Sequence, residues 1–201
     1  MTNKRKGLVT LMAAVLLVAM SVMGTVAYLT SQDVVTNTFT VGNVVITLDE
    51  LDVDNSTPGD NDRDKANVYK LMPGHSYVKD PTIHVKGAET CYLFVKVVNG
   101  ITDVLDQANT IEAQMDVYGW EKLTADGNIY YYANPTTGEK APVSPDTDVH
   151  VFDTFKVKDS AVFADLDAVD ENNITVTAYA VQTDGFENKT AAEIWTTVAF
   201  E

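Results

Sequence analysis

Cysteine is almost absent from the sequence, because Cys91 is the only one in 201 residues. An intramolecular disulfide needs two cysteines, so a hydrophobic core must hold the fold together, even in a compartment that permits disulfides. Cys91 begins the apolar run 91–98, where we expect a buried thiol that packs as a small hydrophobic side chain.

Basic residues are also scarce: 14 Lys and Arg stand against 29 Asp and Glu, for a net charge of −15. An acidic surface of this kind repels nucleic acid and anionic lipid, so we expect neither as a direct partner. The same charge favours solubility before any assembly. It also makes divalent cations candidate modulators.

Catalytic motifs are missing as well. The three histidines, His75, His84 and His150, are isolated, and no His-Glu-x-x-His pair exists to bind zinc on one face of a helix. The sequence has no glycine-rich phosphate loop, nucleophile elbow or Cys/His pair. We therefore expect a protein that is not an enzyme and needs no cofactor; a metal-dependent protease built from these histidines is the enzymatic alternative.

The N-terminus has the three parts of an export signal. The cations Lys4–Lys6 precede an uncharged apolar stretch, 7–23, and small residues follow it. Signal peptidase needs small side chains one and three residues before the cut, and Ala27 and Thr25 supply them, so we predict cleavage before Tyr28.

This cleavage predicts a signal helix, 1–27, followed by a single secreted domain, 28–201. The alternative is an uncleaved anchor, because the chain carries no charge from Gly7 to Thr30, which is long enough to span a bilayer as a helix. In either case the domain lies outside the membrane, secreted into the extracellular matrix or held at the cell surface.

Apolar residues in the domain mostly recur with a period of two, which predicts half-buried strands. The run 91–98 is almost continuously apolar and predicts a central strand covered on both faces. Asp126-Gly127 between two aromatic segments predicts a hairpin with a tight turn. The predicted strands are 35–41, 44–48, 77–85, 91–98, 119–123, 129–132, 149–157 and 174–181.

Two segments have helical spacing, 102–115 and 190–198, with Thr102 or Asp103 capping the first and Asn188 or Thr190 the second. The segments 51–65 and 134–145 read as loops. Many strands without a repeated βαβ pattern predict a mainly β fold, an antiparallel jelly-roll-like sandwich with one or two short helices.

Six motifs are spread over most of the chain: Gly24–Thr30, Asn37–Gly42, Val44–Leu48, Leu71–Gly74, Lys79–Pro81 and Ile174–Gln182. Together they resemble the TasA/camelysin family of secreted biofilm-matrix fibre proteins from Gram-positive bacteria. The resemblance implies export, trimming by a signal peptidase of the SipW type, a jelly-roll fold and self-assembly by donation of the N-terminal strand, with other matrix components as further partners. Camelysin-type members have been described as metalloproteases.

The residues themselves support strand donation independently. After cleavage, 28–41 would be an extended segment whose apolar side chains Val35, Phe39 and Val41 alternate with threonines. An open sheet edge offers backbone donors and acceptors that such a strand can satisfy. The alternative is that this segment pairs within its own subunit.

Two binding sites are weaker candidates. Asp60, Asp62 and Asp64 place carboxylates at every second residue and could hold calcium, but the loop lacks the glycine and bidentate glutamate of an EF-hand. A solvated acidic loop is the alternative. The aromatic cluster of Trp120 and Tyr130 to Tyr132 could bind sugar rings in a monomeric surface adhesin, or could pack in the core.

Overall fold

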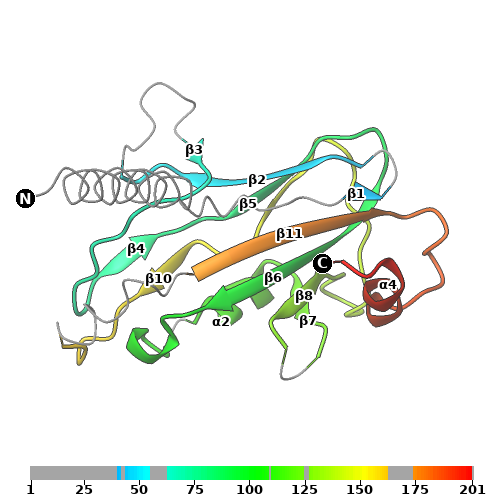
Figure 1. Cartoon of the computed structure of the whole chain (residues 1–201). Coiled ribbons are helices and arrows are strands. Elements are labelled where there is room, and N and C mark those ends of the chain that lie inside the picture. The colour runs from blue at the N-terminus through cyan, green and yellow to red at the C-terminus, as the bar shows by residue number, and fades with distance from the viewer. Residues whose placement is uncertain are drawn as a thin grey trace, which may run out of the picture. The chain divides into compact units, whose positions relative to one another are not determined.

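A computed structural model of the chain describes residues 40–41, 44–54, 63–108, 110–124, 127–162 and 174–200. The predicted signal helix, 1–27, lies outside them. Among the described residues, no helix combines the length and apolar character needed to cross a bilayer. The elements, labelled in Figure 1, are β1 (Thr40–Val41), β2 (Ile46–Leu51), β3 (Arg63–Asp64), β4 (Ser76–Val78), β5 (Thr82–Val85), β6 (Cys91–Asn99), η1 (Thr102–Val104), α2 (Ile111–Val117), β7 (Trp120–Lys122), β8 (Ile129–Tyr132), β9 (Asp148–His150), β10 (Thr154–Lys156), β11 (Ile174–Gln182) and α4 (Ala191–Val198).

The larger sheet has five strands in the order β1-β11-β6-β8-β7. Its centre is the antiparallel ladder of β6 and β11, which runs from Cys91 opposite Gln182 to Asn99 opposite Ile174. β1 differs from the other strands, because it pairs with β11 in the parallel direction and covers only Ala180 and Val181. The predicted central strand 91–98 is confirmed.

The second sheet has four strands in the order β3-β2-β5-β9. The predicted strands 77–85 and 149–157 are each interrupted, the first between β4 and β5 and the second between β9 and β10. Backbone hydrogen bonds continue across this interruption, from Lys79 N–H to the Asp153 carbonyl and from Val151 N–H to the Pro81 carbonyl. β4 and β10 therefore extend the ribbon of β5 and β9 past a proline, which has no N–H to donate.

The main core lies between the two sheets. Alternate residues of β6, such as Leu93 and Val95, point inward and are at most 1% exposed, and Ile83 of β5 faces them from the other sheet. On β11 the small inward residues Ala178 and Ala180 are fully buried. The arrangement is a β-sandwich, as the period-two pattern predicts.

The outer face of the five-stranded sheet carries a second core under α4 (Figure 1). Phe94 and Tyr179 point outward and contact Trp195 and Phe200, whose ring centroids lie 5.0 Å apart. Thr190 caps α4 and forms a capping box with Glu193, so the second predicted helix and its cap are confirmed. Both faces of β6 are buried where α4 covers the sheet.

The predicted helix 102–115 is wrong in its first half. Only η1, a single 3-10 turn, forms there, and α2 begins at Ile111 after its cap Thr110, instead of the predicted Thr102 or Asp103. Leu105 forms an isolated bridge with Val157, and Asp106 N–H donates to the Lys156 carbonyl. These sheet-like bonds hold the chain extended between the two helical turns.

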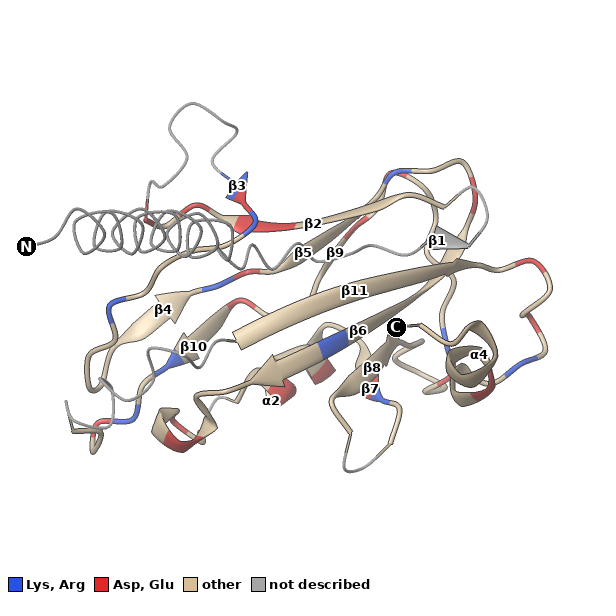
Figure 2. Ribbon diagram, in the orientation of Figure 1, with Lys and Arg blue, Asp and Glu red and all other residues tan. Residues whose placement is uncertain are grey.

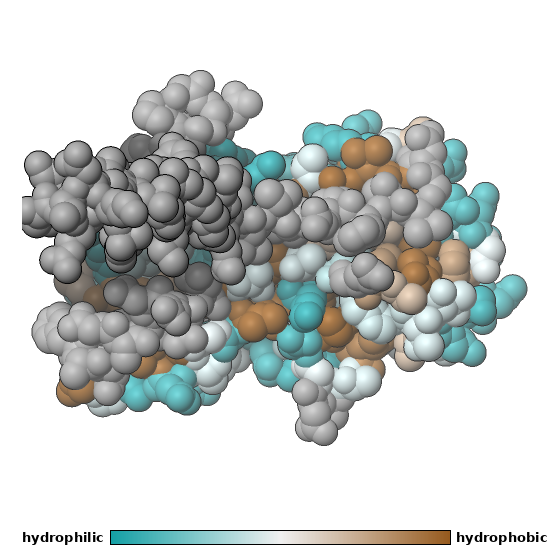
Figure 3. Space-filling view, in the orientation of Figure 1, coloured by the Kyte–Doolittle hydropathy of each residue, from teal (hydrophilic) through white to brown (hydrophobic). Residues whose placement is uncertain are grey.

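The aromatic hairpin is confirmed, with Trp120 opposite Tyr132 in β7 and β8. Its turn differs from the prediction: Gly127 does not have a positive φ, whereas Gly119 just before the hairpin does (φ 86°). Asp126 lies outside the described residues. On the face of the molecule that Figure 1 presents, Figure 3 shows hydrophobic residues interspersed with hydrophilic ones among the described residues.

Candidate functional site

The residues predicted for export and assembly are only partly described. Thr25, Ala27 and Tyr28, at the predicted cleavage site, lie outside the described residues, as do Val35 and Phe39. Val41 is the last residue of β1, opposite Val181. The end of the predicted donor segment therefore pairs with β11 of its own chain.

β1 lies along one side of β11, and this side of β11 is otherwise a sheet edge. On one side β11 is fully paired with β6, from Ile174 to Gln182. On the other side β1 reaches only Ala180 and Val181, and no described strand lies beside 174–178. Backbone donors and acceptors on this side of the strand point away from the sheet, in the manner of an edge strand.

This edge carries no charge. β11 contains no Asp, Glu, Lys or Arg, and Figure 2 shows it without blue or red along its length. Charged residues are present on most of the other described edge strands: Glu121 and Lys122 on β7, Arg63 and Asp64 on β3, Asp148 on β9 and Lys156 on β10. The short edge strand β4 is uncharged like β11, but it has only three residues. Charges on an edge strand oppose the addition of another strand, so β11 offers the longest uncharged edge in the described part of the chain.

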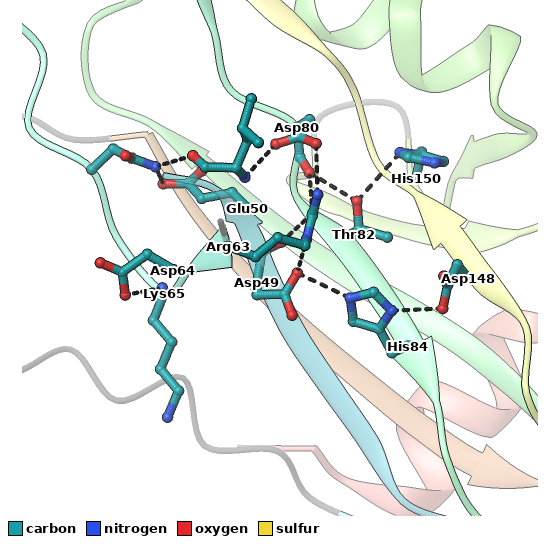
Figure 4. Close-up of polar contacts among 12 residues, drawn as sticks. Asp49, Glu50, Arg63, Asp64, Lys65, Asp80, Thr82, His84, Asp148 and His150 are labelled. Carbon is teal, nitrogen blue, oxygen red and sulfur yellow. Dashed lines mark hydrogen bonds and ion pairs between the residues drawn. The ribbon is translucent and has the colours of Figure 1, made fainter. Parts of the chain in front are cut away.

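A polar network covers the outer face of the four-stranded sheet (Figure 4). Arg63 on β3 joins two carboxylates, because its guanidinium contacts Asp49 and lies 3.0 Å from Asp80 Oδ2. The same group donates to the backbone carbonyls of both residues. Arg63 thus links β3, a strand of two residues, to β2 through Asp49 and to the segment before β5 through Asp80.

His84 lies at the centre of this face between two carboxylates. Its Nε2 is 2.9 Å from Asp49 Oδ1 on β2, and its Nδ1 is 2.6 Å from Asp148 Oδ1 on β9. Burial lowers the pKa of His84, but hydrogen bonds and attraction from Asp49 and Asp148 outweigh burial and raise it overall. The hydrogen bond from His84 in turn lowers the pKa of Asp148.

The three histidines predicted as an alternative zinc cluster do not meet at one site. His150 Nδ1 is 3.3 Å from the Thr82 hydroxyl, whereas His84 is bound to carboxylates. His75 lies at a separate turn, where its ring contacts the Pro73 carbonyl. Within the described ranges, no three His, Cys, Asp or Glu side chains are placed to hold a metal ion together.

Of the calcium candidates, Asp60 and Asp62 lie outside the described residues. Asp64 is described in β3, and its carboxylate accepts a hydrogen bond from Lys65 N–H at 2.6 Å. The calcium hypothesis therefore remains a prediction for this loop.

The aromatic cluster packs as core. Trp120 is 2% exposed and donates its indole N–H to the His150 carbonyl, and Tyr132 packs edge-on against it. Tyr130 is buried on the same face, while Tyr131 joins the cluster under α4. Cys91 is fully buried, and burial raises the pKa of its thiol to about 11, which fits the predicted inert role.

A cavity of about 230 Å³ lies between the end of β6, the start of α2 and β10. Val97, Ile111 and Phe155 form its apolar wall. Asp106 and Lys156, which pair at 3.0 Å, lie at its polar side. Sequence reasoning missed this cavity, because it forms where the predicted helix 102–115 is interrupted.

Taken together, the described part of the chain forms a β-sandwich in which the edge of β11 is uncharged and only partly covered by β1. Comparison of the chain with protein-family models, curated proteins and solved structures finds no match. Arguments about function must therefore come from the residues and their geometry.

Proposed function

We propose that this protein is a secreted structural subunit of extracellular, biofilm-matrix fibres, which polymerises by donating the segment 28–41 to β11 of another copy, where it takes the place of that copy's own β1. The resemblance to TasA/camelysin proteins supports this proposal, as does the export signal. A SipW-type peptidase would release the segment, and other matrix components are further candidate partners.

The observation that carries the proposal is the uncharged edge of β11 beside 174–178. β1 shows the direction in which a strand fits there, because Thr40 lies opposite Ala180 in parallel register. The same register continued along the strand would align 34–38 with 174–178. Asn37 of the donor would then face Thr177 of the acceptor.

The energetics favour an added strand. The donor's apolar side chains Val35 and Phe39 would each contribute about 1.5–3 kcal/mol if fully buried. New backbone hydrogen bonds would satisfy the open edge, and together these gains offset much of the cost of ordering a short segment. In the register proposed for the donated strand, strand parity would put Phe39 of the donor on the same face as Tyr179 of the acceptor and the aromatic residues under α4.

A cysteine pair tests the predicted contact between copies. Asn37→Cys and Thr177→Cys would be made in separate chains, exported, mixed and oxidised. We expect a disulfide between residues 37 and 177 in the mixture, identified by peptide mapping, because a donated strand brings these side chains together. Cys91 is buried in both chains and serves as a common background.

Glu121→Cys on the charged edge β7 is the matched control, and Asn37→Cys should not link to it above background. Electron microscopy of the cleaved protein should show filaments that are lost in a Val35→Asp/Phe39→Asp variant. A cleaved protein that stays monomeric by light scattering at high concentration, or filaments that persist in this variant, would overturn the proposal.

A second candidate function is a monomeric surface adhesin or binding module, which the cavity beside α2 favours. Its mixed lining suits a small ligand with both apolar and polar groups. Retention of the monomer on a glycan or host-protein array, lost on changing Phe155 to Ala, would support this alternative over the fibre subunit.

A further inference from the structure

Glu50 occupies an unusual position on β2. The alternation Ile46, Leu48, Glu50 places its carboxylate on the inward face of the strand, and the residue is only 3% exposed. Carboxylates are rarely so buried unless they are paired. The partners of Glu50 are Lys79, which lies between β4 and β5, and Asn67, which lies between β3 and β4.

The carboxylate of Glu50 bridges an amine and an amide. Lys79 Nζ donates to Glu50 Oε2 at 2.6 Å, and Asn67 Nδ2 donates to Glu50 Oε1 at 3.0 Å. The nucleophilic nitrogen of a lysine and the side-chain amide of an asparagine are therefore held by two oxygens of one proton acceptor. Glu50 is placed to move a proton from one nitrogen to the other.

The Asn67 amide is also held for attack at its carbonyl carbon. Its Oδ1 accepts a hydrogen bond from Val53 N–H at 2.7 Å, and its Nδ2 donates to the Leu51 carbonyl at 2.8 Å. These partners define which end is oxygen, since only the oxygen can accept and only the nitrogen can donate. Val53 N–H points to the oxygen on which negative charge would develop.

The surroundings exclude most water. The side chains of Lys79 and Glu50 are 12% and 4% exposed, and the ring of Tyr69 lies 5.9 Å from Lys79 Nζ. Burial, reinforced by the negative charge of Glu50, raises the pKa of Tyr69. In such a site a buried ion pair adds little net stability, because desolvation offsets the attraction. A chemical role accounts for the arrangement better.

We propose that Lys79 and Asn67 join in an intramolecular isopeptide bond, with Glu50 as the proton carrier. Glu50 takes a proton from the Lys79 ammonium, and the freed amine attacks Cγ of Asn67. The new N–C bond pushes an electron pair onto Oδ1, which Val53 N–H stabilises. Collapse of this intermediate breaks the Cγ–Nδ2 bond, and the nitrogen leaves as ammonium with the protons that Lys79 has given up.

This reaction needs no oxidant, metal or energy source, and Glu50 ends as the carboxylate it was at the start. The product closes a covalent loop between the segment after β3 and the start of β5. A cross-link of this kind restricts the unfolded chain as a disulfide does. It would supply a covalent constraint to a chain in which Cys91 has no cysteine partner.

Mass spectrometry of the folded, full-length chain tests the proposal. The intact mass should fall below the sequence value by one ammonia molecule, and digestion should yield a branched peptide joining residues 67 and 79. Trypsin should fail to cut after Lys79, because an acylated lysine has no positive charge. The measurement applies equally to monomer and fibre, so it does not depend on assembly.

Two variants test the roles of Glu50 as proton carrier and of Lys79 as nucleophile. Glu50→Gln keeps the shape of the side chain but cannot accept the proton, and Lys79→Arg keeps the charge but lacks a nucleophilic amine. Both should lose the branched peptide completely while circular dichroism shows a folded protein. Glu121→Gln, the same change at an exposed acid on β7, should retain it.

Three outcomes overturn the proposal. The first is a folded wild-type chain that keeps its full sequence mass after prolonged incubation. The second is ammonia loss that persists in Lys79→Arg, because this would be cyclisation of Asn67 alone. The third is a branched peptide that forms undiminished in folded Glu50→Gln.

Discussion

The two sheets of this molecule are stabilised in different ways. In the five-stranded sheet, Lys96 is the only charged residue of β6 and β11, and apolar side chains pack on both faces where α4 covers them. The four-stranded sheet buries only its inner face, and its outer face carries the network of Asp49, Arg63, His84 and Asp148.

The two kinds of stabilisation differ in how strictly they fix the alignment of neighbouring strands. Hydrophobic burial is non-directional, and on its own it tolerates more than one alignment of similar strands. The charged network is directional, because each group must meet its partner at hydrogen-bond distance. The four-stranded sheet therefore carries specific cross-strand contacts, while the five-stranded sheet leaves β11 uncharged, which is the feature on which the proposed strand addition depends.

The largest effect on stability should come from the aromatic layer. Phe94 is fully buried under Trp195 and Phe200. Phe94→Ala should lower the free energy of unfolding by about 3–5 kcal/mol, because it removes a large side chain and leaves a cavity. Urea denaturation measures this loss, and Val98→Ala, at a 43% exposed position of the same strand, is the control. A loss below about 1 kcal/mol for Phe94→Ala would contradict the importance given to this layer.

A smaller effect is expected in the charged network. Arg63→Met should lower the free energy of unfolding by about 1–3 kcal/mol, because Asp49 and Asp80 lose their shared partner. Urea denaturation should show this loss relative to Lys65→Met, an exposed cation two residues away. Equal stability of the two variants would show that the network contributes nothing specific.

The smallest expected effect is a dependence on pH. Because the folded state raises the pKa of His84, its contribution to stability is complete below the unfolded value of about 6.5 and is lost as pH rises through the folded value. Wild-type stability should therefore fall relative to His84→Gln as pH rises above about 6.5. Urea denaturation across pH measures this difference.

His75→Gln is the control for this experiment, because in the described structure that ring contacts a backbone carbonyl instead of carboxylates. It should keep the wild-type dependence on pH. A His84→Gln variant with an unchanged pH profile would contradict the role assigned to the two carboxylates.

The repetitive features of the fold could be predicted from the sequence. A continuous apolar run identified β6, an aromatic segment next to a turn identified β8, and alternation identified β11. Thr190, one of the two predicted caps, marked the start of α4, and all of these signals are local. The interruption between β4 and β5 near Pro81 could not be predicted, nor could the break in the predicted helix 102–115 after η1. Both depend on backbone bonds to distant segments, such as that from Asp106 to Lys156.

For the candidate site residues, too, the sequence predicted the local features but not the contacts between distant segments. The pattern indicated that the segment ending at Val41 could act as a strand, but not that β1 runs parallel to β11. The alternation Ile46, Leu48, Glu50 puts Glu50 on the inward face of the strand, but nothing local indicates which residues pair with it. Its burial arises because Lys79 and Asn67 return to β2 from later in the chain.

The central ladder of the sandwich also bears on how the chain folds. β6 is synthesised long before β11, yet in the folded protein Cys91 pairs with Gln182 and Asn99 pairs with Ile174. Contacts between such remote residues close large loops, which slows folding. Until β11 has been synthesised, β6 is an apolar segment without its partner strand on that side, and such an unpaired strand is prone to aggregation.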